Sequence, residues 1–225
     1  MILSIETSTP VCSVALHEKG ELVSYMELRV GQSHSGQLTM MVDNILERAA
    51  VSYEKIEAVA VSEGPGSYTG LRIGVSTAKG ICYANELPLL NVGTLDSMAL
   101  AMGKNAGEEE VVCPMLDARR MEVYCAIYQN RKLLKGVEAK VIDEESFSDL
   151  YKHKKLLLGG PGSEKCKGVL ISSNIAFIDG VGPSAKEIGE LAWEKYQNQD
   201  FADLAYFEPF YLKAFLAKKP SKKPF

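Results

Sequence analysis

The stretch that follows residue 63 has the residue types of an anion-binding turn. An apolar run over residues 59–61 stops at Gly64-Pro65-Gly66-Ser67, and helical spacing begins near residue 68, which predicts a buried strand, a tight turn and a helix. Free N–H groups at a helix start suit a phosphate, so the candidate phosphate-binding residues are Gly64, Gly66, Ser67 and Thr69. The glycine spacing matches neither the P-loop nor the dinucleotide-binding motif. From the residues alone, a turn built of glycines for structural reasons is the simpler interpretation.

A second group of charged residues, Asp117-Ala118-Arg119-Arg120, follows another predicted strand. Two guanidinium groups beside a carboxylate suit a nucleotide or RNA phosphate. Arginines in a cleft equally form ion pairs that hold two lobes together. Both interpretations of Asp117, Arg119 and Arg120 stay open at this point.

The histidines and cysteines do not form a metal-binding or nucleophilic pattern. The three histidines are His17, His34 and His153, which fall in a strand end, a helix start and a lysine-rich loop. The five cysteines are odd in number and contain no C-x-x-C pair, which argues against a disulfide framework and a zinc site. Their apolar surroundings predict buried thiols, and the spacing of serine, histidine and aspartate does not demand a hydrolase triad.

Composition limits the classes of function. The 225 residues carry 25 basic and 29 acidic side chains, a net charge of −4, which argues against tight, autonomous binding of nucleic acid. No apolar run approaches the roughly 18 residues of a membrane span, and the chain opens directly on a strand. We therefore expect a cytoplasmic protein without a membrane contact.

The order of predicted elements indicates an α/β protein of two lobes. Residues 1–102 contain three strands, a helix, a strand, a helix, a strand and a helix, the repeating unit of the actin-like/sugar-kinase ATPase fold. A polar, glycine-bearing stretch then suggests a domain boundary. Residues 103–208 resemble an abridged copy of the first lobe, and residues 209–225 form a lysine-rich tail. Residues 159–182, rich in glycine and serine, give no clear pattern.

Residues 62–80 closely resemble the GPGSxTGLRIGxxxAKG stretch of the bacterial TsaB (YeaZ) family. Three further segments resemble the family in the same order: residues 2–9, 117–124 and 208–213. The resemblance implies the actin-like fold and a non-catalytic subunit that supports the TsaD protein in threonylcarbamoyladenosine synthesis on tRNA. It implies a TsaE-like third member, ATP used by the complex, no cofactor required by this subunit, and a homodimer when the subunit is alone. A free-standing small-molecule kinase or ATPase of the same fold, with weak nucleotide binding, is the alternative.

The resemblance also assigns expectations to single residues. It places Glu6 at the metal-coordinating acid of the fold, where relatives usually carry aspartate, so Glu6 is either a weak site in the cleft or a cap for the following turn. The two metal-binding histidines of TsaD fall on about Thr94 and Met98. Neither residue suits that metal, so the resemblance implies no metal site here.

The helix after the glycine turn carries small residues every four positions. Gly70, Gly74 and Ala78 leave one face almost without side chains, and a second helix can approach such a face closely. With an apolar stripe on the preceding helix, this face is the predicted partner interface, and packing inside the lobe is the alternative. The stripe comprises Leu38, Met41, Val42 and Ile45. An interface predicts that Gly74→Leu weakens pairing and leaves the melting temperature of a monomeric form nearly unchanged.

Overall fold

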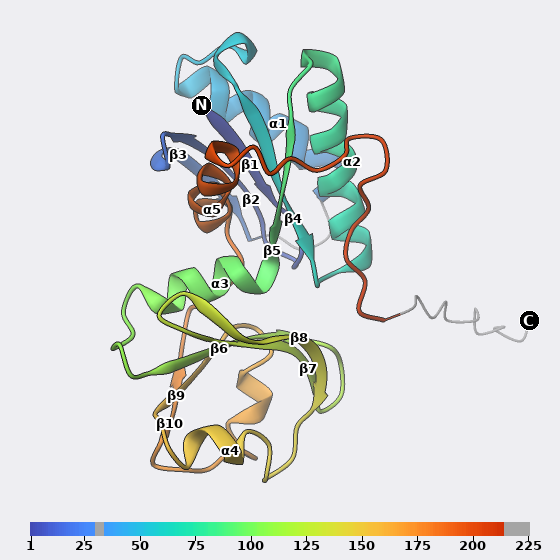
Figure 1. The fold of residues 1–225 in the computed structure, drawn as a ribbon. Coiled ribbons are helices and arrows are strands. Elements are labelled where there is room, and N and C mark those ends of the chain that lie inside the picture. The colour runs from blue at the N-terminus through green and yellow to red at the C-terminus, as the bar shows by residue number, and fades with distance from the viewer. Residues whose placement is uncertain (30–33, 214–225) are drawn as a thin grey trace, which may run out of the picture.

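The computed structural model describes residues 1–29 and 34–213, which form two lobes stacked one above the other (Figure 1). Each lobe contains one five-stranded sheet, which confirms the two-lobed α/β architecture. Residues 214–225 of the predicted tail lie outside the described residues. No helix in the described part of the chain is long and apolar enough to cross a bilayer. All five cysteines are buried and free, as their apolar surroundings predicted.

The first sheet has the strand order β3-β2-β1-β4-β5. Strands β1, β2 and β3 are antiparallel neighbours, whereas β4 and β5 continue the sheet in parallel with β1. Parallel neighbours need a crossover, and α2 supplies the one between β4 and β5. The elements are β1 (Ile2–Glu6), β2 (Cys12–Glu18), β3 (Glu21–Leu28), α1 (His34–Arg48), β4 (Ala58–Gly64), α2 (Tyr68–Asn85), β5 (Leu89–Gly93) and α3 (Thr94–Gly103).

The second sheet repeats this topology in the order β10-β9-β6-β7-β8. Strand β6 pairs antiparallel with β7 and parallel with β9, as β1 pairs with β2 and β4. Strand β10 lies in the stretch that gave no clear sequence pattern. The elements are β6 (Val111–Asp117), β7 (Glu122–Gln129), β8 (Lys132–Val141), α4 (Ser148–Tyr151), β9 (Leu156–Gly159), β10 (Ile175–Ile178) and α5 (Ala185–Gln197).

Helix α5 returns from the second lobe and packs on the first sheet, so the predicted second domain of residues 103–208 was wrong in extent. Its buried Ile188 and Ala192, one turn apart, join Ile2, Ala60 and Leu90 in one apolar cluster. Helices α1 and α2 cover the opposite face of that sheet. Both faces of the first sheet therefore need helices from distant parts of the chain.

Helix α3 lies between the lobes and belongs to the core that joins them (Figure 1). Its Leu95 and Met98 are buried at 1% and 0% exposure, and they pack with Val112 and Leu157 of the second lobe. A helix with so many buried apolar residues needs partners on several sides. The predicted boundary at residue 102 consequently divides one apolar core.

The predicted partner interface on α1 and α2 is buried inside the first lobe, which corrects that interpretation. A Cβ atom at Gly74 would lie 2.2 Å from Thr7 Oγ1, and one at Gly70 would lie 2.1 Å from the Thr7 carbonyl oxygen. The Thr7 hydroxyl donates to the Gly70 carbonyl oxygen at 2.8 Å. The other predicted interface residues are no more than 4% exposed: Leu38, Met41, Val42, Ile45 and Ala78. The small residues therefore leave room for the turn after β1 to pack against α2, and not for a second chain.

Candidate functional site

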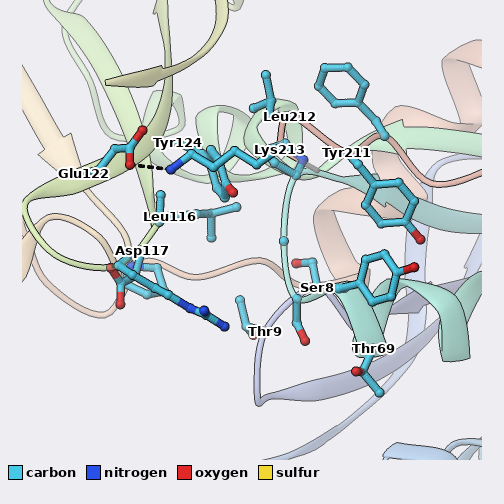
Figure 2. A pocket seen from close by; sticks show the side chains of 18 of the residues that line it. Ser8, Thr9, Thr69, Leu116, Asp117, Glu122, Tyr124, Tyr211, Leu212 and Lys213 are labelled. Carbon is cyan, nitrogen blue, oxygen red and sulfur yellow. Dashed lines mark hydrogen bonds and ion pairs between the residues drawn. The ribbon is translucent and has the colours of Figure 1, made fainter. Parts of the chain in front are cut away.

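A cleft of about 720 Å³ lies between the lobes, where strands β1, β4 and β6 end (Figure 2). Ligands of α/β proteins commonly bind outside the carboxyl ends of the strands. The first lobe contributes the turns after β1 and β4, the second contributes the turn after β6, and the C-terminal segment 210–213 forms a further wall. Four segments that are far apart in the sequence thus meet at one site.

The glycine turn reaches the cleft through three of its four predicted residues. Gly66, Ser67 and Thr69 line the cleft, but Gly64 does not. A Cβ atom at Gly64 would lie 2.6 Å from the Phe210 carbonyl oxygen. Ser67 caps α2 by accepting the Gly70 N–H at 3.3 Å, and its own N–H donates to the Ser8 carbonyl oxygen at 2.6 Å. Two of the first N–H groups around the helix start are thus already bonded, which leaves fewer for an anion.

The turn after β6 places Asp117, Arg119 and Arg120 on the opposite wall. Partial burial raises the pKa of Asp117, but the ion pair with Lys165 and the N–H of Arg119 outweigh this and hold it below its usual value. The side chains of Arg119 and Arg120 are exposed and form no ion pair with a described residue. Within the described residues, these arginines do not tie the lobes together, and both guanidinium groups are available to a ligand.

Glu6 is not a cleft residue, which corrects that expectation. Its side chain is fully buried, it is missing from the cleft wall, and its Oε1 accepts the backbone N–H of Ser8. Burial raises the pKa of Glu6, and its hydrogen bonds with Ser8 only partly oppose that effect. The carboxyl group therefore caps the turn after β1, which was the alternative interpretation.

We expect Glu6→Gln to stabilise the protein increasingly as the pH rises above about 4.5. The folded-state pKa lies above the ordinary value of 4.5, so above that pH the unfolded chain ionises while the folded chain retains its proton. The cost to the wild-type protein grows by up to about 1.4 kcal/mol per pH unit until the folded-state pKa is reached, and glutamine removes it. Urea denaturation of both proteins between pH 4.5 and neutrality measures the difference. The exposed Glu47→Gln is the control, and a pH-independent difference for Glu6→Gln would contradict a protonated Glu6.

The C-terminal segment contributes cleft residues to which the sequence analysis assigned no role. The Tyr211 ring lies 4.9 Å from that of Tyr68, and its hydroxyl accepts from Arg72 Nε at 3.2 Å. Lys213 forms an ion pair with Glu122 of the second lobe (Figure 2). The segment therefore links α2 of the first lobe to β7 of the second. The available signal was the resemblance of residues 208–213 to the family, but the position of the segment depends on α5, which precedes it.

The side chains that line the cleft suit an anionic ligand with a flat ring. Two free guanidinium groups and the start of α2 suit phosphate oxygens, and the tyrosine rings suit stacking. Both acids on the wall, Asp117 and Glu122, are paired with lysines. The described residues contain no group of three or more His, Cys, Asp or Glu that could hold a metal ion. Thr94 and Met98 are buried between the lobes, away from the cleft.

Comparison with known proteins shows which family this chain resembles. The family model described as TsaD, tRNA N6-adenosine threonylcarbamoyltransferase, matches residues 29–213. The tRNA threonylcarbamoyladenosine biosynthesis protein TsaB of Escherichia coli is 31% identical over 99% of each chain. The solved structure of YeaZ from Pseudomonas aeruginosa superimposes with a TM-score of 0.78 and 26% identity, covering 94% of this chain and 99% of that one.

A more distant structure has the same fold. The activator of 2-hydroxyisocaproyl-CoA dehydratase from Clostridium difficile gives a TM-score of 0.50 at 11% identity over 88% of this chain and 95% of that one. With the repeated strand order of the two lobes, this likeness identifies the actin-like/sugar-kinase ATPase fold. From the similarity over nearly its whole length, the chain belongs to the TsaB (YeaZ) family of tRNA threonylcarbamoyladenosine biosynthesis proteins.

Proposed function

We propose that this protein is the non-catalytic subunit of a tRNA threonylcarbamoyladenosine synthesis complex. It supports a TsaD-like protein in transferring the threonylcarbamoyl group to the adenosine next to the anticodon. The observation that carries the proposal is the likeness to Escherichia coli TsaB over 99% of both chains. This protein meets tRNA through the complex, and a TsaE-like ATPase is its third member.

The cleft supports a binding role more than a catalytic one. Its acids are held in ion pairs with Lys165 and Lys213, and the fold's usual acid, Glu6, is sealed beneath the turn. None of the three acids, Asp117, Glu122 and Glu6, is therefore positioned to act as a general base on a ligand in the cleft. This arrangement favours the subunit interpretation over a free-standing kinase or ATPase.

We propose weak nucleotide binding in the same cleft. Arg119 and Arg120 face it with free guanidinium groups, and Gly66, Ser67 and Thr69 bring the start of α2 to it. Because part of the helix start is already bonded inside the protein, the phosphate contacts rest mainly on the arginines. The subunit requires no cofactor of its own, and ATP is used by the complex.

The outward faces of α1 and α2 are the surface we propose for the partner. Met40 on α1 is 53% exposed and Tyr83 on α2 is 83% exposed, although the inward faces of both helices are buried. Large apolar side chains that face solvent on neighbouring helices suit a helix-to-helix contact. The same surface serves a homodimer when the subunit is alone and a TsaD-like protein in the cytoplasmic complex.

Reconstitution tests the proposed function. Purified TsaD-like and TsaE-like proteins, tRNA, ATP and threonylcarbamoyl-adenylate are combined with and without this protein, and modified adenosine is measured by mass spectrometry. We expect an increase of at least about tenfold when this protein is present, equivalent to about 1.4 kcal/mol. Met40→Glu should reduce both the increase and copurification, because it places a charge at the contact. Leu134→Glu is the matched control, since Leu134 is 56% exposed on β8 of the second lobe.

Two outcomes would contradict this function. Full activity of the TsaD-like and TsaE-like proteins without this protein would remove the need for the subunit. Turnover of ATP by the isolated protein at about one per second or faster would support the kinase alternative instead.

A further inference from the structure

A second cavity of about 400 Å³ lies between α3, the end of α5 and the C-terminal end of β5. It shares no lining residue with the cleft and has no part in the function proposed above. Its apolar lining includes Val92, Ala99, Leu100 and Leu191. A cavity of this size with an apolar floor and a few polar groups is typical of a small-molecule site.

Asp96 is held in this cavity by a neutral donor. The hydroxyl of Tyr128, a residue only 3% exposed, donates to Asp96 Oδ1 at 2.7 Å. Burial, together with the charge of Asp96, raises the pKa of Tyr128, so the phenol keeps the proton that it donates. The second carboxylate oxygen lies over Gly93, where any Cβ would come within 1.9 Å of it. The glycine therefore makes room for the carboxylate, and Asp96 Oδ2 has no hydrogen-bond partner among the described residues.

Glu63, like Asp96, has a neutral hydrogen-bond donor on one of its carboxylate oxygens. The side-chain amide of Asn91 donates to Glu63 Oε2, and Glu63 Oε1 has no hydrogen-bond partner in the part of the chain that the structure describes. The cations of the cavity already have acids of their own: Lys195 pairs with Asp200 at 2.9 Å, and Arg131 contacts carboxylates of α5 at 3.5 and 3.6 Å. The carboxylates of Glu63 and Asp96 thus face the cavity with neutral partners and an open oxygen each.

We propose that this second cavity binds a small organic cation, an ammonium or guanidinium group on a short aliphatic chain. The cationic head hydrogen-bonds to the open oxygens of Asp96 and Glu63, where charge assistance makes such bonds strong. The aliphatic chain lies on the apolar floor around Leu100 and Leu191. An anion is disfavoured here because the four carboxylates of the lining, Glu63, Asp96, Glu194 and Asp200, outnumber its two cations, Arg131 and Lys195, in contrast to the arginine-lined cleft.

Titration of the full-length protein with n-butylammonium and n-butylguanidinium tests the proposal, with backbone amide shifts in NMR spectra as the readout. We expect saturable shifts at Gly93 and Leu100, and at least about tenfold weaker binding of the neutral 1-pentanol. Asp96→Asn keeps an acceptor for the Tyr128 hydroxyl and removes the charge, so it should weaken cation binding by about tenfold or more. Glu63→Gln should weaken it as well, while the exposed Glu109→Gln is the matched control and should not.

Several results would overturn the proposal. They are equal binding of 1-pentanol, unchanged affinity in Asp96→Asn and Glu63→Gln, shifts spread over acidic surface residues, or no saturable shift with either cation. Thermal melting of each variant reports folding separately, and if Asp96→Asn does not fold, the comparison of Glu63→Gln with Glu109→Gln decides. The cleft and its partners have no part in this experiment, so its failure would leave the proposed function unaffected.

Discussion

Replacing Gly74 by leucine is expected to destabilise the first lobe strongly rather than to weaken pairing selectively. A Cβ atom at this position would lie 2.2 Å from Thr7 Oγ1, and the turn after β1 that carries Thr7 is itself buried. Helix α2 has no room to retreat, since Leu71 and Val75 on the same helix are buried at 0% and 4% exposure. Overpacking usually costs about 1–3 kcal/mol, and a clash of this depth reaches the upper end of that range or more. Urea denaturation followed by circular dichroism measures the loss.

The same helix supplies a matched control at Gly80. A Cβ atom there meets nothing within 4 Å, so Gly80→Leu is expected to keep the wild-type stability or to raise it by up to about 1 kcal/mol through helix propensity. Analytical ultracentrifugation of both variants reports pairing separately from folding. A Gly74→Leu protein of normal stability that no longer pairs would contradict the packing seen here and restore the interface interpretation.

A fragment that ends at residue 102 is expected not to fold. It lacks α5, whose Ile188 and Ala192 cover Ile2, Ala60 and Leu90 on one face of the first sheet. It also exposes the side of α3 that packs against Val112 and Leu157 of the second lobe. A sheet with one bare apolar face cannot bury enough surface to offset the entropy of ordering its chain. We expect no cooperative thermal transition and strong binding of a hydrophobic dye.

The full-length chain provides a single-residue version of this test. Ile188→Ala should lower the free energy of unfolding by about 2–5 kcal/mol, because the isoleucine is fully buried against the sheet. Tyr206→Ala is the matched control, since Tyr206 is 84% exposed, and we expect little change. Cooperative unfolding of the fragment would show that α5 is not needed for the first lobe.

The sequence predicted the elements around the glycine turn accurately. Strand β4, the turn and helix α2 follow from an apolar run, Gly64-Pro65-Gly66-Ser67 and the helical spacing after it, all within a short stretch of chain. The strand predicted before Ala118 was confirmed as β6. Strand β10 was missed because it has four half-buried residues and lies in a stretch without periodicity.

Part of the site also followed from the sequence. Asp117, Arg119 and Arg120, which the sequence singled out as candidate ligand-binding residues, line the cleft. Glu6 was misplaced because its position on β1 does not reveal that the turn after β1 closes over it. The second cavity had no sequence signal, since Glu63, Asp96 and Tyr128 come from two lobes and three separate elements.

Sequence by itself determined the local structure of this protein, its α/β class and its resemblance to a family, because periodicity, turn residues and caps act over neighbouring positions. Tertiary structure alone decided what each surface meets. The face of α2 that carries Gly70 and Gly74 leaves room for Thr7. Helix α5 covers a sheet whose strands come far earlier in the chain, and residues 210–213 complete the cleft. An apolar or small-residue face indicates only that another segment packs against it. Which segment does so depends on contacts between distant residues, and no local sequence pattern specifies those contacts.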